Sequence, residues 1–115
     1  MSFGTQAGLG NKGFESYSGG RSYFIFTAAM GTTPQLVKYG ATRLAGITNP
    51  GATAFAVTLS LYDSNTTTSP ATNGTLVQTI TTLQPGTTLI DIPMFNGIVI
   101  VASAPITGTV LIQYV

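Results

Sequence analysis

The sequence contains no cysteine, no histidine and no tryptophan among its 115 residues. Without cysteine there is no disulfide, no thiolate nucleophile and no sulfur-ligated metal, and the redox compartment cannot be read from the sequence. Without histidine there is no Ser-His-Asp triad, no imidazole base and no imidazole metal ligand. Because these are the commonest catalytic and metal-binding groups, we expect a protein that is not an enzyme and needs no cofactor.

Charge is scarce as well, since charged residues make up 6% of the chain, against about 25% in ordinary soluble domains. The net charge of +1 provides no basic surface for nucleic acid. A monomer with so few charges has little electrostatic repulsion to keep it apart from its neighbours. The composition therefore predicts a protein that works inside an assembly; the alternative is a soluble domain surfaced with Thr, Ser, Asn and Gln.

Long apolar runs are also missing. A membrane-spanning helix needs about 20 apolar residues in succession. The two best candidates, "YFIFTAAM" and "GIVIVASAPI", are much shorter and end at glycine, proline or polar residues. We therefore predict no membrane span.

Glycine is concentrated in residues 1–21, where "GLGNKG" matches the G-x-G-x-x-G spacing of dinucleotide-binding loops. That spacing binds phosphate only where a buried strand leads into the first glycine and a helix starts at the last. No apolar run precedes it here, and Gly19-Gly20 interrupts the segment after it, so we predict no nucleotide site. Glycine at this density favours neither helix nor strand. We divide the chain into an N-terminal arm, 1–21, and one domain, 22–115.

Four large apolar side chains lie between the glycines of the arm, and a purely flexible linker seldom needs them. Docking of the arm on a neighbouring subunit would bury these side chains. The alternatives are an arm folded back on its own domain and an arm without fixed structure. We predict that the arm binds a partner, together with two arginines whose planar guanidinium groups suit carboxylates. The predicted partner-binding residues are Phe3, Leu9, Phe14, Tyr17, Arg21 and Arg43.

From residue 22 onward the pattern is typical of β-strands. In "FAVTLSLY", 55–62, every second residue is large and apolar, so these residues share one face. In "LVQTIT", the alternation predicts Leu76, Gln78 and Ile80 on one face. "GIVIVA", 97–102, is apolar on both faces and is predicted to be a central strand.

Turn signals at short spacing separate these strands, among them "TNPGAT", "LQPGTT" and "FNG". Asn96-Gly97 favours a tight hairpin, and Pro85-Gly86 favours a type II turn. No window of helical length shows a clean amphipathic period. The prediction is an all-β fold with seven or eight antiparallel strands in two packed sheets.

Three carboxylates could carry chemistry, and Glu15 lies in the arm. We expect Asp63 to accept hydrogen bonds from N–H groups of the turn that it begins, and Asp91 to face solvent or a partner. A catalytic acid–base pair or a calcium site would have to be built from these last two residues, and we predict neither. Tyr39, Tyr62 and Tyr114 are candidates for stacking on sugars, or simply strand residues whose hydroxyls reach water.

The segments "ATRLAGITNPG", "VTLSLYDSNTT", "LVQTITTL", "IPMFNGIVIVAS" and "GTVLIQYV" occur in an order that resembles small virion proteins of tailed bacteriophages. The resemblance covers about residues 36–115 and consists of turn and strand patterns rather than catalytic signatures. It is carried by Gly40, Leu44, Gly46, Ile47, Tyr62, Asp63, Phe95, Asn96, Gly97, Ile98, Gly108, Thr109, Val110, Ile112 and Tyr114.

The resemblance implies an antiparallel β-sandwich of jelly-roll type on the surface of a phage particle. Together with the scarce charge and the arm, this leads us to predict a capsid decoration, or cement, protein that binds neighbouring major capsid subunits and forms a homo-oligomer, with a trimer as the expected form. The alternative is a tail or fibre component whose loops, such as 63–75, bind host glycan. The long glycine-rich arm departs from the family pattern and leaves the position on the particle open.

Overall fold

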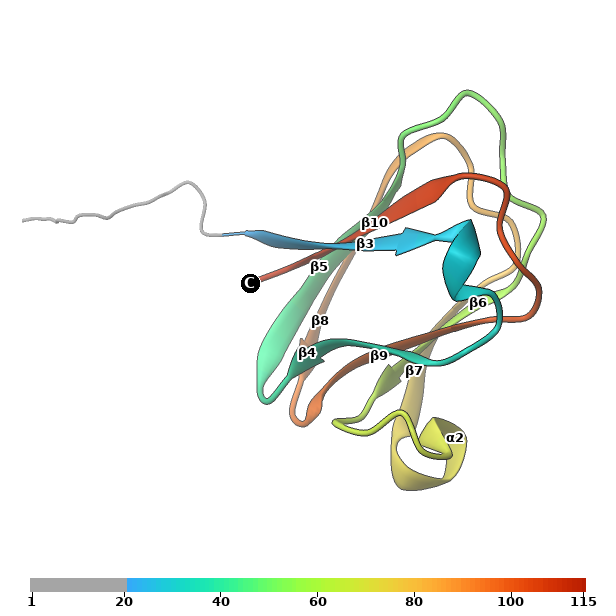
Figure 1. The fold of residues 1–115 in the computed structure, drawn as a ribbon. Helices are drawn as coiled ribbons and strands as arrows, with labels where there is room; N and C mark the ends of the chain where they lie inside the picture. Colours follow the sequence, from blue (N-terminus) through green and yellow to red (C-terminus); the bar gives the residue numbers. More distant parts are fainter. Residues whose placement is uncertain (1–20) are drawn as a thin grey trace, which may run out of the picture.

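The computed structural model describes residues 21–115, which form two four-stranded antiparallel sheets packed face to face (Figure 1). The strands are β3 (Ser22–Thr27), β4 (Gln35–Tyr39), β5 (Thr42–Asn49), β6 (Leu59–Asp63), β7 (Thr75–Ile80), β8 (Gly86–Met94), β9 (Gly97–Ala102) and β10 (Thr109–Tyr114). Two short helices, η1 (Ala28–Met30) and α2 (Pro70–Asn73), lie in the connections. Neither helix has the length or the apolar character that a membrane crossing requires.

The strand order identifies the fold as a jelly roll. The first sheet has the order β3-β10-β5-β8 and the second has the order β4-β9-β6-β7. Along the chain, every connection except the one from β6 to β7 crosses from one sheet to the other. Eight strands wound in this way form the double-sheet jelly roll. The predicted all-β sandwich is therefore confirmed for the described residues, and it has eight strands.

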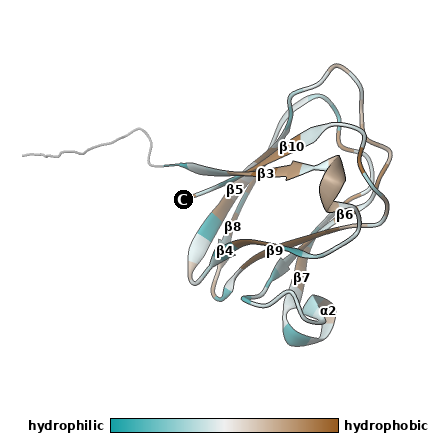
Figure 2. Ribbon diagram, in the orientation of Figure 1, coloured by the Kyte–Doolittle hydropathy of each residue, from teal (hydrophilic) through white to brown (hydrophobic). Residues whose placement is uncertain are grey.

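The core lies between the sheets and is built from the inward residues of both. Figure 2 shows the hydrophobic colour along β9 and η1, whereas α2 and its loop are pale or hydrophilic. Strand β9 lies between β4 and β6 and is buried almost throughout, which confirms its predicted central position. The largest fully buried side chains are Phe26, Leu44, Ile47, Leu59, Leu61, Leu83, Met94, Ile98, Ile100, Ile112, Val99 and Val110.

Two strand predictions need correction. The predicted strand 55–62 begins only at Leu59, although Phe55 is still buried and forms an isolated bridge with Leu83. In β7 the predicted facing is wrong. Val77 is an extra residue relative to β6, so Leu76 is exposed, while Val77 and Ile80 pack against the core. A bulge of one residue reverses the alternation, because the side-chain period of a strand is two.

The turn predictions have different outcomes. Gly86, which follows Pro85, has a φ of 99°, as the third residue of a type II turn requires. Asn96-Gly97 lies in a tight turn, but this turn joins β8 to β9, which belong to different sheets. The predicted hairpin is therefore wrong. The turn carries the chain from one sheet to the other. The dipeptide Asn-Gly favours a tight turn in a hairpin and in such a crossover alike, so the local sequence does not distinguish them.

Candidate partner-binding surfaces

The interior of the described domain is closely filled. Residues 21–115 enclose no pocket, and within them no three acidic side chains come together where a metal ion would bind. Both acidic side chains in this range accept hydrogen bonds from the protein itself: Asp91 from Arg43, and Asp63 from two backbone N–H groups. On the exterior of these residues, exposed large apolar side chains are the notable feature.

Asp63 has the predicted type of role, but at a different turn. Its side chain is 8% exposed, and its two oxygens accept hydrogen bonds from the backbone N–H groups of Phe95 (3.0 Å) and Asn96 (2.8 Å). The sequence predicted that Asp63 would bind the turn that it begins itself. Instead, the hydrogen bonds that its carboxylate accepts fix the β8–β9 turn, which lies at the same end of the sandwich.

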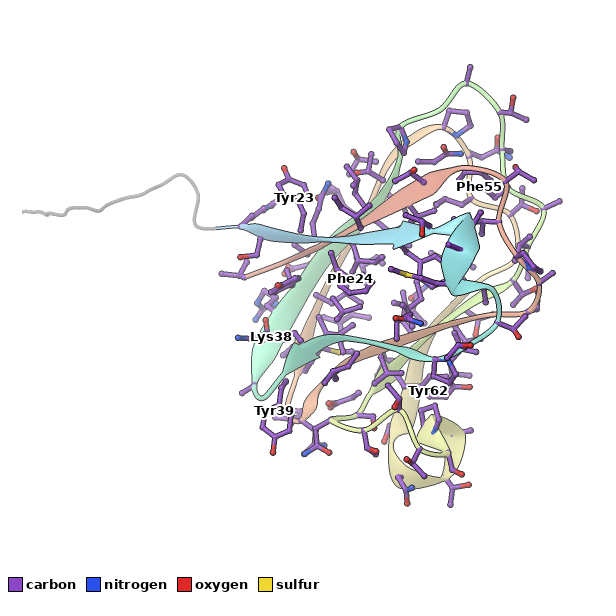
Figure 3. The ribbon with its side chains drawn as sticks, in the orientation of Figure 1. Tyr23, Phe24, Lys38, Tyr39, Phe55 and Tyr62 are labelled. Carbon is purple, nitrogen blue, oxygen red and sulfur yellow. The ribbon has the colours of Figure 1, made fainter. Side chains whose placement is uncertain are left out.

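The β8–β9 turn and the β4–β5 turn together expose two aromatic rings. Tyr39 is 69% exposed and Phe95 is 77% exposed. The turns are joined, because the N–H of Gly40 donates to the carbonyl of Asn96 at 2.9 Å and Tyr39 pairs with Gly97. Figure 3 shows Tyr39 at this end, pointing away from the sandwich. The aromatic end, defined as Tyr39 and Phe95, therefore presents two apolar rings on a backbone held by hydrogen bonds.

Arg43, a predicted partner-binding residue, forms an ion pair within its own chain. Its Nη1 lies 2.8 Å from Oδ1 of Asp91, and both side chains are substantially exposed. Asp91 therefore faces solvent as predicted, and its backbone has a φ of 59° in the bulged part of β8. A surface pair of this kind contributes about 0–1 kcal/mol to stability. The guanidinium is thus already occupied by an acidic neighbour.

The outer face of the first sheet changes in character from β3 to β8. Tyr23 and Ile25 on β3 are 59% and 55% exposed, and Figure 3 shows Tyr23 pointing away from the second sheet. Farther across, the face is polar: Gln113 Nε2 donates to Thr48 Oγ1 at 2.6 Å, and Thr48 and Thr87 share a hydroxyl hydrogen bond of 2.8 Å. The exposed large apolar side chains of this face therefore lie on its two edge strands, Tyr23 and Ile25 on β3 and Leu89 on β8.

On the outer face of the second sheet, four apolar residues, one from each strand, lie side by side and form a row across the sheet. Leu36 pairs with Val99, Val99 pairs with Tyr62, and Tyr62 pairs with Leu76. Val99 is fully buried within this row, whereas Leu36 and Leu76 at its two ends are exposed. The row crosses the sheet from edge to edge and is a second apolar surface.

The structure separates the three tyrosines considered for sugar stacking. Tyr39 is strongly exposed at the aromatic end, Tyr62 is half-buried in the outer row, and Tyr114 packs against the core. Only Tyr39 therefore offers a free ring face among these three. Sequence reasoning missed Phe95 as an exposed ring, although its place beside Asn96-Gly97 indicated a turn residue.

Only some of the predicted partner-binding residues lie in the described part of the chain. Phe3, Leu9, Phe14 and Tyr17 lie outside the described residues, as does most of the predicted arm. Arg21 is exposed and directly precedes β3. Reasoning from the sequence did not single out Tyr23 and Ile25, because the strand "SYFIFTA" is apolar at nearly every position and gives no sign of which residues face outward.

No family model matches the chain, and no curated protein and no solved structure matches it either.

Proposed function

We propose that this protein is a structural virion protein that decorates and stabilises a phage capsid by binding neighbouring major capsid subunits. One observation carries the proposal: large apolar side chains are exposed on a domain with hardly any charge. Burial of apolar surface contributes about 25 cal/mol per Å², so a partner that covers these side chains would gain binding free energy. The exposed large hydrophobic residues are Tyr23, Ile25, Leu36, Tyr39, Leu76, Leu89, Phe95 and Val115.

The fold and the sequence pattern support the same proposal. The jelly roll is an architecture of viral capsid domains, although it also occurs in lectins and other proteins. The resemblance to small tailed-phage virion proteins includes Asp63, Asn96 and Gly97. These residues hold the end of the sandwich that exposes Phe95. On this proposal the arm, Arg21, Arg43 and the exposed apolar residues contact the major capsid protein, and the protein acts as a homo-oligomer on the capsid surface.

Quantitative mass spectrometry of purified particles of the encoding phage tests the proposal. The measured quantity is the number of copies of this protein relative to the major capsid protein. We expect copies in a fixed ratio to the shell subunits. A handful of copies per particle would move the protein to the tail or fibre, and its absence from particles would overturn a virion role.

A tail or fibre domain that binds host glycan is the second candidate, and the aromatic end favours it. Sugar rings stack on exposed aromatic faces, and Tyr39 and Phe95 present such faces at one end of the sandwich. The suggested loop 63–75 contains no aromatic residue, so these two rings would have to supply the stacking. A glycan array probed with the full chain tests this. Loss of signal in Tyr39→Ala and Phe95→Ala, but not in the matched exposed variant Tyr23→Ala, would support glycan binding.

A further inference from the structure

The four edge strands of the two sheets differ in how well they are protected against pairing with another strand. Proteins protect edges with charged residues, proline and bulges, because an edge offers a row of unpaired backbone N–H and C=O groups. β8 contains Asp91, Pro93 and a bulge, and β4 contains Lys38 and a bulge at Val37. β7 has neither charge nor proline, but it is bulged at Val77.

β3 has none of these protections. Its six residues, SYFIFT, include no charge and no proline. Its register with β10 continues without a shift from Thr27 opposite Thr109 to Ser22 opposite Tyr114. Within the described part of the chain, β10 is its only sheet neighbour. β3 is therefore a regular, uncharged edge, and its second row of backbone groups is available to another strand.

The side chains of β3 suit a second β3 strand. Tyr23 and Ile25 lie on the outer face and are more than half exposed. Phe24 points between the sheets (Figure 3) but is only partly buried. An antiparallel pair with its two-fold axis at Phe24 places each Tyr23 opposite Ile25 of the other copy, an aromatic–β-branched pair that stabilises sheets. The two Arg21 side chains then lie at opposite ends of the pair and do not repel each other.

We propose that β3 pairs antiparallel with β3 of a second copy of this chain, so that the two first sheets join into one continuous sheet. The contact is isologous, since each copy presents the same strand, and it closes as a dimer. It differs from the trimer expected from the sequence, which needs two different surfaces at each contact. The pairing concerns the isolated protein and does not depend on a role in a capsid.

Sedimentation velocity of the purified full chain over a concentration series tests the proposal. We expect a dimer, and an increase of at least about tenfold in the dissociation constant of Ile25→Lys, because the lysine introduces a charge into the paired edge. Leu89→Lys is the matched control, since Leu89 is exposed on the opposite edge strand of the same sheet. It should dimerise like the unmodified chain. At concentrations low enough for all three proteins to be monomeric, both variants should have the melting temperature of the unmodified chain, since dimerisation itself raises that temperature.

A monomer at every concentration, a trimer, or a dimer that Ile25→Lys leaves unchanged would each overturn the proposal. The register is tested separately by cross-linking of introduced cysteines. Only these cysteines can react, because the chain has no cysteine of its own. Under mild oxidation, Tyr23→Cys should form a disulfide with Ile25→Cys when the two variants are mixed, because directly opposite Cβ atoms lie about 4.5–5.5 Å apart. Each variant should form a disulfide with itself much less, because these diagonal positions lie about 7–8 Å apart. Preferential cross-linking within either single variant would overturn an axis at Phe24.

Discussion

The carboxylate of Asp63 accepts a 2.8 Å hydrogen bond from the backbone N–H of Asn96, which lies 33 residues farther along the chain. The other carboxylate oxygen accepts from the N–H of Phe95 at 3.0 Å. One buried side chain at the end of β6 thus satisfies two backbone donors in the turn between β8 and β9. Because β8 and β9 lie in different sheets, this contact fixes one of the places where the chain crosses between the layers.

Replacement of Asp63 by asparagine should destabilise the domain. The variant keeps one acceptor oxygen but turns an amide N–H₂ group toward a backbone donor, so one buried N–H loses its partner. Hydrogen bonds to charged groups contribute about 1.5–3 kcal/mol, and we expect a loss of that order in urea-induced unfolding. Asp91→Asn, at the exposed carboxylate, should change stability far less. Equal stability of Asp63→Asn and the unmodified chain would contradict the role assigned to Asp63.

Gly97 should tolerate no side chain. Its φ is 150°, and a Cβ atom at this position would collide with the backbone carbonyl oxygens of Lys38 and Ser64. Gly40, in the adjoining turn, also has a positive φ of 93°, but has open space around its Cβ position. Gly40→Ala should therefore lower the free energy of unfolding only by the strain of a positive φ in a residue with a side chain, about 1–2 kcal/mol. Gly97→Ala should cost about 1–3 kcal/mol more, the usual range for overpacking.

Thermal and urea unfolding of the two glycine variants measure this difference. Similar stabilities for Gly40→Ala and Gly97→Ala would show that the β8–β9 turn relaxes away from Lys38 and Ser64. That outcome would remove the close packing as the reason for glycine at position 97.

The ion pair between Arg43 and Asp91 should contribute little to folding. Both side chains are exposed and screened by water, and pairs of this kind have coupling energies of about 0.2–1 kcal/mol. A double-mutant cycle with Arg43→Ala and Asp91→Ala measures the coupling, which should fall as salt is added. A coupling well above this range, independent of salt, would mean that the pair is a structural element of the bulged β5–β8 edge.

Deletion of residues 1–21 should leave the sandwich folded and weaken binding to capsids. The described core residues, including Phe26 and the partly buried Phe24, all lie beyond the deletion. We therefore expect a melting temperature within a few degrees of the full chain, since about 1 kcal/mol shifts the midpoint of a domain this size by about 4–8 °C. Co-sedimentation with particles that lack the protein measures the binding. Full binding by the shortened chain would contradict a role for the arm.

The sequence predicted the fold class because strand alternation is a local property. Val110 and Ile112 lie inward in β10, as their spacing indicates, and β9 is buried on both faces, as its composition indicates. The resemblance added the jelly-roll type, which alternation and turn signals do not specify.

The candidate surfaces were less accessible to prediction, because they depend on which strands lie at the edges and where the ladders are bulged. Leu76 was predicted to share a face with Ile80, and the extra residue Val77 places them differently. Arg43 forms an ion pair with Asp91, 48 residues away in the chain, which the sequence did not indicate; its contact with a partner stays a prediction. Such pairings arise between distant segments, and no local pattern records them.

The sequence by itself determined a nearly uncharged all-β domain, because composition and period-two alternation depend only on the order of residues. The tertiary structure decided that Asp63 fixes the β8–β9 turn, that Tyr39 and Phe95 share one end, and that β3 is an unprotected edge. The physical reason is the winding of the jelly roll. Most sheet neighbours come from distant parts of the chain, so edges, bulges and buried donors are defined only once the two sheets have closed on each other.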